Sequence, residues 1–278
     1  MNFHKPANLA ELYEILPGIE GKKYFLAGGT DINVQIKNDM IKNADIIYIN
    51  HLNDLRGIKE EGEFIYLGAL TSYADILSSD LMREKFPFLQ KSLNNFASPL
   101  LTEMATIGGN IANGSPTADV TPLLLVENAI LVLGSQEGDR QVKLCEYFTG
   151  YKQNVMQKNE IIKAVLLPKN GEAASYDTFY EKVGARKTLT IAKVAVAGMK
   201  LFENARFKEV KLAVGSLNEY PRRLVKLENY LQGQEQLTLD FAKVEELLAE
   251  EITPISDLRS DKEYRFQVCL NLIKSFLK

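Results

Sequence analysis

Apolar residues in the N-terminal half of the chain switch between helical and strand spacing. Over residues 9–16 they recur every three or four positions behind a capping-box pattern that starts at Asn8, which predicts a helix. Compact apolar runs at 24–26 and 46–49 indicate short buried strands, and the runs on both sides of Glu61-Gly62 predict a hairpin. Strands and helices that do not strictly alternate indicate an α+β fold rather than a doubly wound parallel sheet.

The segment Pro-Lys-Asn-Gly-Glu at 168–172 is polar, rich in turn residues and flanked by two apolar patterns. It predicts the boundary between two domains, 1–170 and 171–278. Beyond it the pattern predicts strands and then helices, which favours a three-stranded antiparallel sheet backed by helices. The expected strands are 175–183, 194–202 and 207–214, with a hairpin at 204–206, and the expected helices are 223–231, 241–249 and 264–277.

Paired glycines interrupt the apolar pattern twice. The first segment, 27–31, follows the strand at 24–26 and precedes a helical pattern for which Thr30 or Asp31 would be the N-cap. The second, 105–122, contains Gly108-Gly109 among small hydrogen-bonding residues and ends at Pro122, which suits the first turn of a helix. Glycines that adopt positive φ can bring backbone N–H groups close to an anion such as phosphate. An ordinary surface turn explains the second segment equally well when it is taken alone.

Composition and charge exclude several classes of function. The net charge of −3 comes from mixed signs without a basic stripe, which argues against a nucleic-acid partner. No apolar run could span a bilayer and the N-terminus lacks a signal-peptide pattern, so we expect a cytoplasmic protein. The two histidines and two cysteines lack metal-ligand spacing, and both Cys145 and Cys269 are expected to be buried structural thiols. Redox chemistry on this chain would therefore need a bound organic cofactor.

The two glycine segments resemble the FAD-binding loops of the flavoprotein subunit of the molybdenum hydroxylases, the family of xanthine, carbon monoxide and nicotinate dehydrogenases. The residues that carry the resemblance are Ala27-Gly-Gly-Thr-Asp31 and Thr106-Ile-Gly-Gly-Asn-Ile-Ala-Asn-Gly-Ser-Pro-Thr-Ala-Asp119. Weaker matches follow in the expected order at 160–162, 179–183 with 191–194, and 257–265. The resemblance implies a two-part FAD-binding domain of the vanillyl-alcohol oxidase / p-cresol methylhydroxylase type, followed by a smaller C-terminal domain.

The same resemblance implies roles for individual residues. Backbone N–H groups of both glycine segments would hold the FAD pyrophosphate, and Asp119 would bind the adenosine ribose, although it could instead be the N-cap of the helix at Pro122. Ile162 would pack against the isoalloxazine ring and Lys182 would lie near its polar edge, although Lys182 could instead be a solvated lysine at a strand end. The implied cofactor-binding residues are Ala27, Gly28, Gly29, Thr30, Asp31, Thr106, Ile107, Gly108, Gly109, Asn110, Ser115, Thr117, Asp119, Ile162 and Lys182.

The implied function is electron transfer, with no catalytic acid, base or metal on this chain. The resemblance implies a molybdopterin-binding subunit that carries out the hydroxylation and an iron–sulfur subunit whose two 2Fe–2S clusters pass electrons to FAD. The acceptor could be NAD, but residues 184–188 depart from the acidic loop of animal xanthine dehydrogenases. The alternatives are a self-sufficient flavin oxidase or reductase of the same fold and a non-catalytic ligand-binding protein.

Overall fold

The computed structural model describes residues 1–94, 96–169, 176–186 and 189–278, and the chain divides into two compact units. The first unit consists of Met1–Asn113, Ala129–Tyr147 and Asn154–Lys169, and the second of Gly114–Asn128, Phe148–Gln153 and Asn170–Lys278. The expected linker at 168–172 and the expected strand start at 175 lie partly outside the described residues. The division into domains 1–170 and 171–278 stays a prediction.

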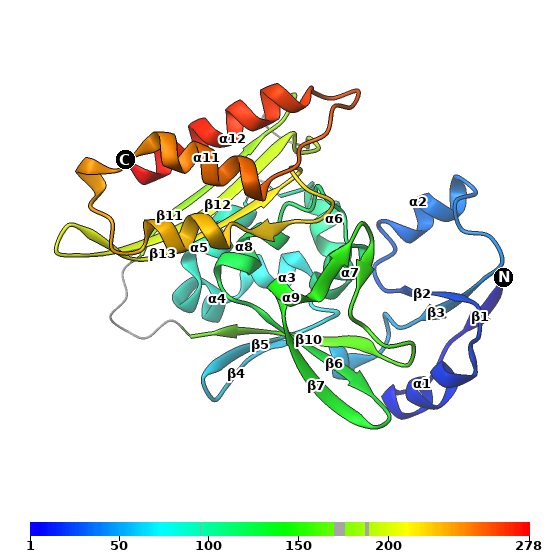
Figure 1. The fold of residues 1–278 in the computed structure, drawn as a ribbon. Coiled ribbons are helices and arrows are strands. Elements are labelled where there is room, and N and C mark those ends of the chain that lie inside the picture. The colour runs from blue at the N-terminus through cyan, green and yellow to red at the C-terminus, as the bar shows by residue number, and fades with distance from the viewer. Residues whose placement is uncertain (95, 170–175, 187–188) are drawn as a thin grey trace. The chain divides into compact units, whose positions relative to one another are not determined.

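The first unit opens with a small parallel sheet of order β1-β3-β2 (Figure 1). Its helices cover opposite faces because Ile46 and Ile47 alternate along the central strand: Ile47 packs with Leu12 of the first helix, and Ile46 packs with Ile32 and Ile36 of the second. The elements are β1 (Asn2–His4), α1 (Leu9–Ile15), η1 (Leu16–Gly18), β2 (Lys22–Leu26), α2 (Ile32–Lys37), β3 (Ala44–Tyr48) and η2 (Asn53–Leu55).

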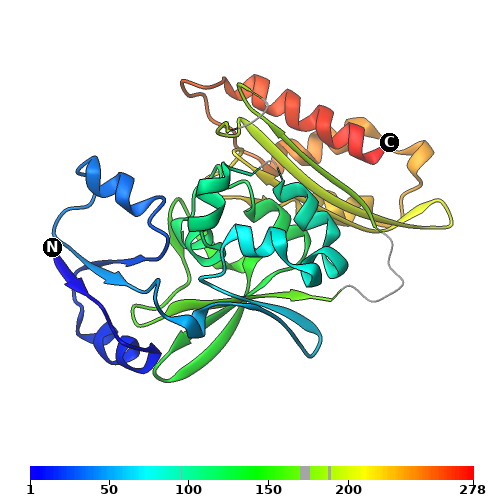
Figure 2. The ribbon, with the colours of Figure 1, turned by 180° about the vertical axis from the view of Figure 1, so that it is seen from behind.

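A five-stranded antiparallel sheet of order β4-β5-β10-β6-β7 and the helices next to it form the rest of the first unit. The central strand β10 is almost entirely apolar and buried, as its position between two hairpins requires, and Figure 2 shows those hairpins on its two sides. The strands are β4 (Ile58–Glu61), β5 (Phe64–Gly68), β6 (Ile130–Ser135), β7 (Gly138–Lys143) and β10 (Ile161–Pro168). The helices are α3 (Tyr73–Ser78), α4 (Asp80–Lys85), α5 (Pro87–Leu93), α6 (Pro99–Met104), α7 (Ile107–Asn113) and α9 (Leu144–Tyr147).

The second unit contains an antiparallel sheet of order β11-β12-β13-β14. The predicted three strands are present, but a short fourth strand occupies Arg222–Arg223, so the helix expected from 223 begins only at Val225. Arg223 pairs with Ala213 of β13 instead of entering the helix, and its guanidinium binds the Glu228 carboxylate. The elements are α8 (Thr121–Val126), β8 (Phe148–Gly150), β11 (Asp177–Val183), β12 (Val194–Glu203), β13 (Arg206–Gly215), β14 (Arg222–Arg223), α10 (Val225–Leu231), η3 (Gln236–Thr238), α11 (Phe241–Glu251) and α12 (Lys262–Leu277), and β9 (Gln153–Asn154) lies where the chain passes from the second unit to the first.

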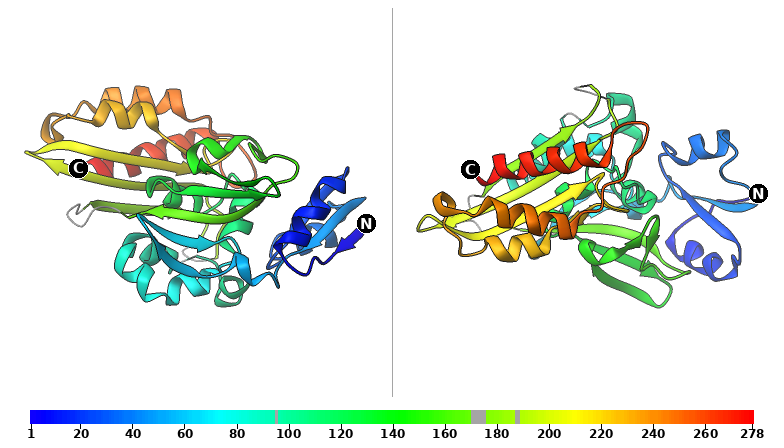
Figure 3. Two further views of the ribbon diagram at one scale, coloured as in Figure 1. Left: turned by 90° about the horizontal axis from the view of Figure 1, so that it is seen from below. Right: turned by 45° about the horizontal axis from the view of Figure 1, so that its top comes forward.

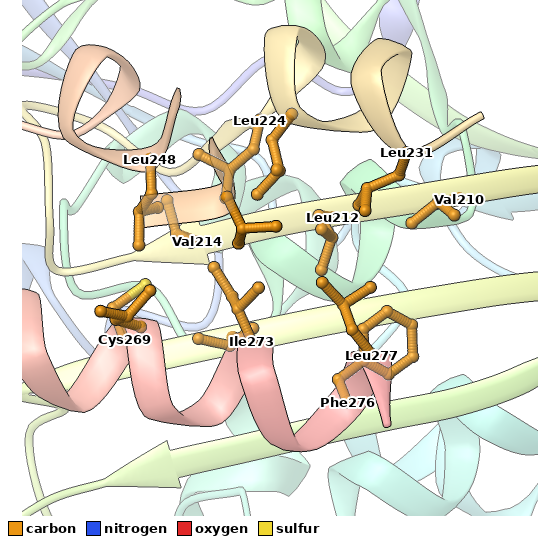
Figure 4. Packing of buried hydrophobic residues seen from close by; sticks show 14 of the residues in the cluster. Val210, Leu212, Val214, Leu224, Leu231, Leu248, Cys269, Ile273, Phe276 and Leu277 are labelled. Atoms are coloured by element: carbon orange, nitrogen blue, oxygen red, sulfur yellow. The ribbon is translucent and has the colours of Figure 1, made fainter. Parts of the chain in front are cut away.

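Helices cover both faces of this sheet within the second unit. On one face α10, α11 and α12 enclose an extended apolar cluster, in which Val214 and Leu212 meet Ile273 (Figures 3 and 4). On the other face α8 packs against β12 and β13, where a Cβ added at Gly215 would lie 3.3 Å from the Pro122 ring and 3.5 Å from the Ala195 methyl. Small residues on this face therefore let α8 approach the sheet closely.

The prediction that both cysteines are buried is wrong for one of them. Cys269 on α12 is fully buried in the apolar cluster, and this burial raises the pKa of its thiol. Cys145 on α9 is exposed because that helix of four residues buries Leu144 and Tyr147 and turns the positions between them outward. Across the described ranges, no helix has the length and apolar content needed to cross a bilayer, and no group of His, Cys, Asp and Glu could hold a metal ion.

Candidate functional site

The first glycine segment is a tight connection between β2 and α2. Gly29 has φ of +75°, and a Cβ added at Gly28 would lie 1.6 Å from the Met104 carbonyl oxygen, so no other residue fits there. Within the described part of the chain, the N–H groups of Gly28, Gly29 and Thr30 donate no hydrogen bond. Three successive backbone donors of this kind are the arrangement that binds phosphate groups.

The predicted capping of α2 is only half right. Asp31 occupies the N-cap position, but its backbone is in the αR region and its side chain makes no capping hydrogen bond. The Asp31 carboxylate instead accepts a hydrogen bond of 3.0 Å from the Asn113 side-chain amide at the end of α7. Together with the contact between Gly28 and Met104, this bond places the two glycine segments side by side within the first unit.

The second glycine segment is helical where positive φ was expected. Gly108 and Gly109 lie in α7, and positive φ occurs only afterwards, at Gly114 with +58°. The helix forms because its first N–H groups already have acceptors: Ile107 donates to the Thr71 carbonyl, Gly108 to the Ala69 carbonyl and Gly109 to the Thr106 hydroxyl.

These bonds change how the second segment could contact a ligand. The N–H groups of Ile107, Gly108 and Gly109 are already used, and the N–H of Asn110 donates to the Thr106 carbonyl within the helix. The side-chain oxygen of Asn110, in contrast, is buried without a hydrogen-bond partner among the described residues. A ligand would therefore meet this side chain and the open face of the Gly109 backbone rather than a row of N–H groups.

In the second unit, Asp119 is a partly buried carboxylate with one oxygen paired and one unpaired. Its Oδ2 lies 2.7 Å from Lys182 Nζ, whereas Oδ1 is buried and has no partner among the described residues. Burial raises the pKa of Asp119, and the ammonium of Lys182 opposes that rise. The unpaired oxygen is suited to accept a hydrogen bond from a ligand.

Both alternative roles considered for this pair are wrong. The N-cap of α8 is Val120, in the αR region and without a side-chain cap, because the Asp119 carboxylate points to Lys182 instead. Lys182 is only 10% exposed, so it is not a solvated lysine at a strand end. Pro122 does occupy the first turn of α8, as predicted.

Three further predicted site residues remain to be placed: Ser115 and Thr117 in the second unit, and Ile162 in the first. Ser115 and Thr117 form a compact turn in the second unit, in which Ser115 Oγ lies 3.1 Å from Thr117 Oγ1 and accepts from the Thr117 N–H. Ile162 is buried on β10 in the first unit, opposite Leu133.

Two residues that organise the site, Asn113 and Tyr180, are not among the implied cofactor-binding residues. The Asn113 amide connects the glycine segments, and the Tyr180 hydroxyl donates to the Asp119 carbonyl oxygen at 3.0 Å. Tyr180 could have been found, because positions 180 and 182 of one strand share a face. Nothing local to Asn113 indicates its partner Asp31.

Glu160 is a buried residue directly before β10, the strand that carries Ile162. Its replacement tests how much the hydrogen bonds of its carboxylate stabilise this part of the fold. Its carboxylate is 4% exposed and accepts from Arg140 Nε at 2.5 Å and from the Gln157 N–H at 2.6 Å. We expect Glu160→Gln to lower the free energy of unfolding by about 2 kcal/mol in urea titrations at pH 7. The exposed Glu61, paired with Lys59, is the control, and Glu61→Gln should cost less than about 0.5 kcal/mol.

The pH dependence of the Glu160 effect follows from its pKa. Arg140 holds the pKa of Glu160 below its usual value. The stabilisation is therefore complete above the unfolded pKa of about 4.3 and is lost as the pH falls through the lower folded value. The difference between wild type and Glu160→Gln should shrink in that acid range, and a difference independent of pH would contradict the ion pair.

Comparison with known proteins shows to which family the chain belongs. Residues 1–170 match the family described as the FAD binding domain in molybdopterin dehydrogenase, and residues 179–278 match the CO dehydrogenase flavoprotein C-terminal domain. The chain belongs to this family of FAD-binding medium subunits of molybdenum hydroxylases. The predictions of an α+β fold, an FAD-binding domain and an oxidoreductase subunit are thereby confirmed.

Several members of the flavoprotein family resemble the chain over nearly its whole length. It is 31% identical to the glyceraldehyde dehydrogenase medium chain of Sulfolobus acidocaldarius, over 96% of this chain and 93% of that protein. It is 27% identical to the carbon monoxide dehydrogenase medium chain of Hydrogenophaga pseudoflava, over 99% and 95%. A crystal structure of the Cu,Mo-CO dehydrogenase superposes with a TM-score of 0.90 at 25% identity, covering 99% of this chain and 95% of that one.

Proposed function

We propose that this flavoprotein subunit binds one FAD and passes electrons from 2Fe–2S clusters on an iron–sulfur subunit to an acceptor. The observation that carries the proposal is the set of three unpaired N–H groups at 28–30, which suits the FAD pyrophosphate. FAD, when bound, would accept electrons singly and deliver them in pairs. The substrate would be hydroxylated on a separate molybdopterin-binding subunit; the medium-chain names of relatives support an assembly of several chains.

The residues of this chain would each do a different part of the binding. In the first unit, residues 27–31 would hold the pyrophosphate. Residues 106–110 would contact it through the Asn110 side chain and the Gly109 backbone, which carries no side chain. Ile162 would pack on the flavin ring. In the second unit, Ser115 and Thr117 would offer hydroxyl groups, and the unpaired oxygen of Asp119 would accept a ribose hydroxyl.

The electron acceptor is proposed in its general form, as NAD or another carrier. The segment 184–188 lacks the acidic residues of animal xanthine dehydrogenases, and Lys187 and Thr188 lie outside the described residues. Steady-state reduction of NAD, oxygen and a ferredoxin by the complete complex, with the same substrate, would rank these acceptors. We propose a cytoplasmic location for the complex, which cell fractionation would test.

The visible spectrum of the purified full chain tests the function directly. We expect flavin absorption near-stoichiometric with protein, with the released chromophore identified as FAD. Co-purification from the native organism should recover two further chains that carry iron–sulfur clusters and molybdopterin. A folded chain that neither contains FAD nor takes it up would contradict the proposal, and substrate turnover by the chain alone would point to a self-sufficient enzyme.

A further inference from the structure

Tyr180 and Lys182 hold both the backbone and the side chain of Asp119. The two residues lie two positions apart on β11, so their side chains share one face of the sheet. The Tyr180 hydroxyl donates to the Asp119 carbonyl oxygen at 3.0 Å, and Lys182 Nζ donates to Oδ2 at 2.7 Å. One strand face therefore determines where the backbone of Asp119 lies and which way its carboxylate points.

The charges around Asp119 make Lys182 its counter-ion. The Asp119 side chain is 17% exposed and that of Lys182 10%. Among the described residues, the titratable groups that act on the carboxylate are Lys182 and Tyr180, both from β11. The β12 residues paired with them are Ala195 and Ala197, and the helix α8 that follows Asp119 consists of uncharged residues. Without Lys182, burial would favour the protonated carboxyl.

We propose that Tyr180 and Lys182 are positioning residues of Asp119: Lys182 keeps its carboxylate ionised, and both residues orient it, so that its unpaired oxygen Oδ1 accepts a hydroxyl group of bound FAD. The inference rests on the proposed function. A buried acceptor without a partner is costly, and a ligand hydroxyl would satisfy it. Because Lys182 already neutralises the carboxylate, the site selects a neutral donor rather than a second cation. Lys182 acts in this scheme through Asp119.

FAD dissociation constants measured across pH on the full chain test the inference. Wild-type affinity should be constant at high pH and should fall as the pH drops through the pKa of Asp119, because an ionised carboxylate oxygen is a stronger acceptor than an oxygen of the neutral carboxyl group. In Lys182→Met that pKa rises further, so the fall should begin at a higher pH. Asp119→Asn should bind FAD about tenfold more weakly and without this dependence on acid pH. Tyr180→Phe should bind FAD about fivefold more weakly, and its affinity should begin to fall at the same pH as in the wild type.

Two matched controls come from the same unit. Lys211 is a buried lysine, 4% exposed and paired with Glu209, and the Tyr176 hydroxyl donates to that same carboxylate. Lys211→Met and Tyr176→Phe remove the same groups away from Asp119, so both should keep the wild-type affinity and pH profile. Circular dichroism melts would confirm that each variant is folded.

The outcomes separate this inference from the proposed function. A wild-type chain that binds no FAD overturns the proposed function and this inference with it. Wild-type binding with an unchanged affinity in Asp119→Asn overturns the inference alone, and this nearly isosteric variant decides the question even if Lys182→Met does not fold. If folded Lys182→Met lost FAD affinity at the same pH as the wild type and also had a changed flavin absorption spectrum, Lys182 would lie at the flavin ring instead.

Discussion

Gly109→Leu is expected to abolish FAD binding while the chain remains folded. Among the described residues, a Cβ at this position would lie within 4 Å of the Thr106 hydroxyl alone, at 2.8 Å, so the protein can accommodate a side chain once that hydroxyl shifts. A bound pyrophosphate beside α7 could not, because its approach needs the bare backbone. We expect the dissociation constant for FAD to rise more than about 100-fold, or about 3 kcal/mol. Flavin absorption per mole of protein and far-UV circular dichroism measure the two halves of this prediction.

Gly108 provides the contrast within the same helix. A Cβ at Gly108 would lie 2.6 Å from the Ala69 Cβ and 2.8 Å from the Ala69 carbonyl oxygen, so Gly108→Leu should destabilise the fold itself. Gly109→Leu should therefore be folded but lack FAD, whereas Gly108→Leu should be unstable. Normal FAD content in folded Gly109→Leu would remove the second glycine segment from the site.

Gly28→Ala should have the largest effect on stability of any alanine substitution at a glycine of the site. Its Cβ would overlap the Met104 carbonyl oxygen at 1.6 Å, and a backbone atom cannot move aside as a side chain can. We expect a loss of more than about 4 kcal/mol in the free energy of unfolding, measured by urea denaturation without FAD.

Gly18→Ala is the control for this substitution. Gly18 ends η1, has ordinary φ, and a Cβ there meets nothing within 4 Å. Its replacement should change stability by no more than about 0.5 kcal/mol. Equal stability of the Gly28 and Gly18 variants would show that the two glycine segments do not touch.

Local features were predictable because their determinants lie within a few residues. The Asn8 side chain caps α1 through the Glu11 N–H, as its spacing indicates. The hairpin at 204–206 forms with φ of 53° at Asn204 and 61° at Ala205, values that suit the twist of β12 and β13. These interactions need no distant partner, so the amino-acid pattern alone determines them.

Long-range contacts decided the rest of the site. Gly108 and Gly109 are helical because the Ala69 and Thr71 carbonyls reach the start of α7, which no pattern within residues 105–122 reveals. Lys182 pairs with Asp119 across 63 positions of sequence, which excludes both simple alternatives for the two residues. The sequence alone thus determined much of the secondary structure, the positions of the two glycine segments and their likeness to an FAD-binding family. Tertiary structure decided which donors and acceptors remain for a ligand, because a distant strand or helix can satisfy a group that looks open in the sequence.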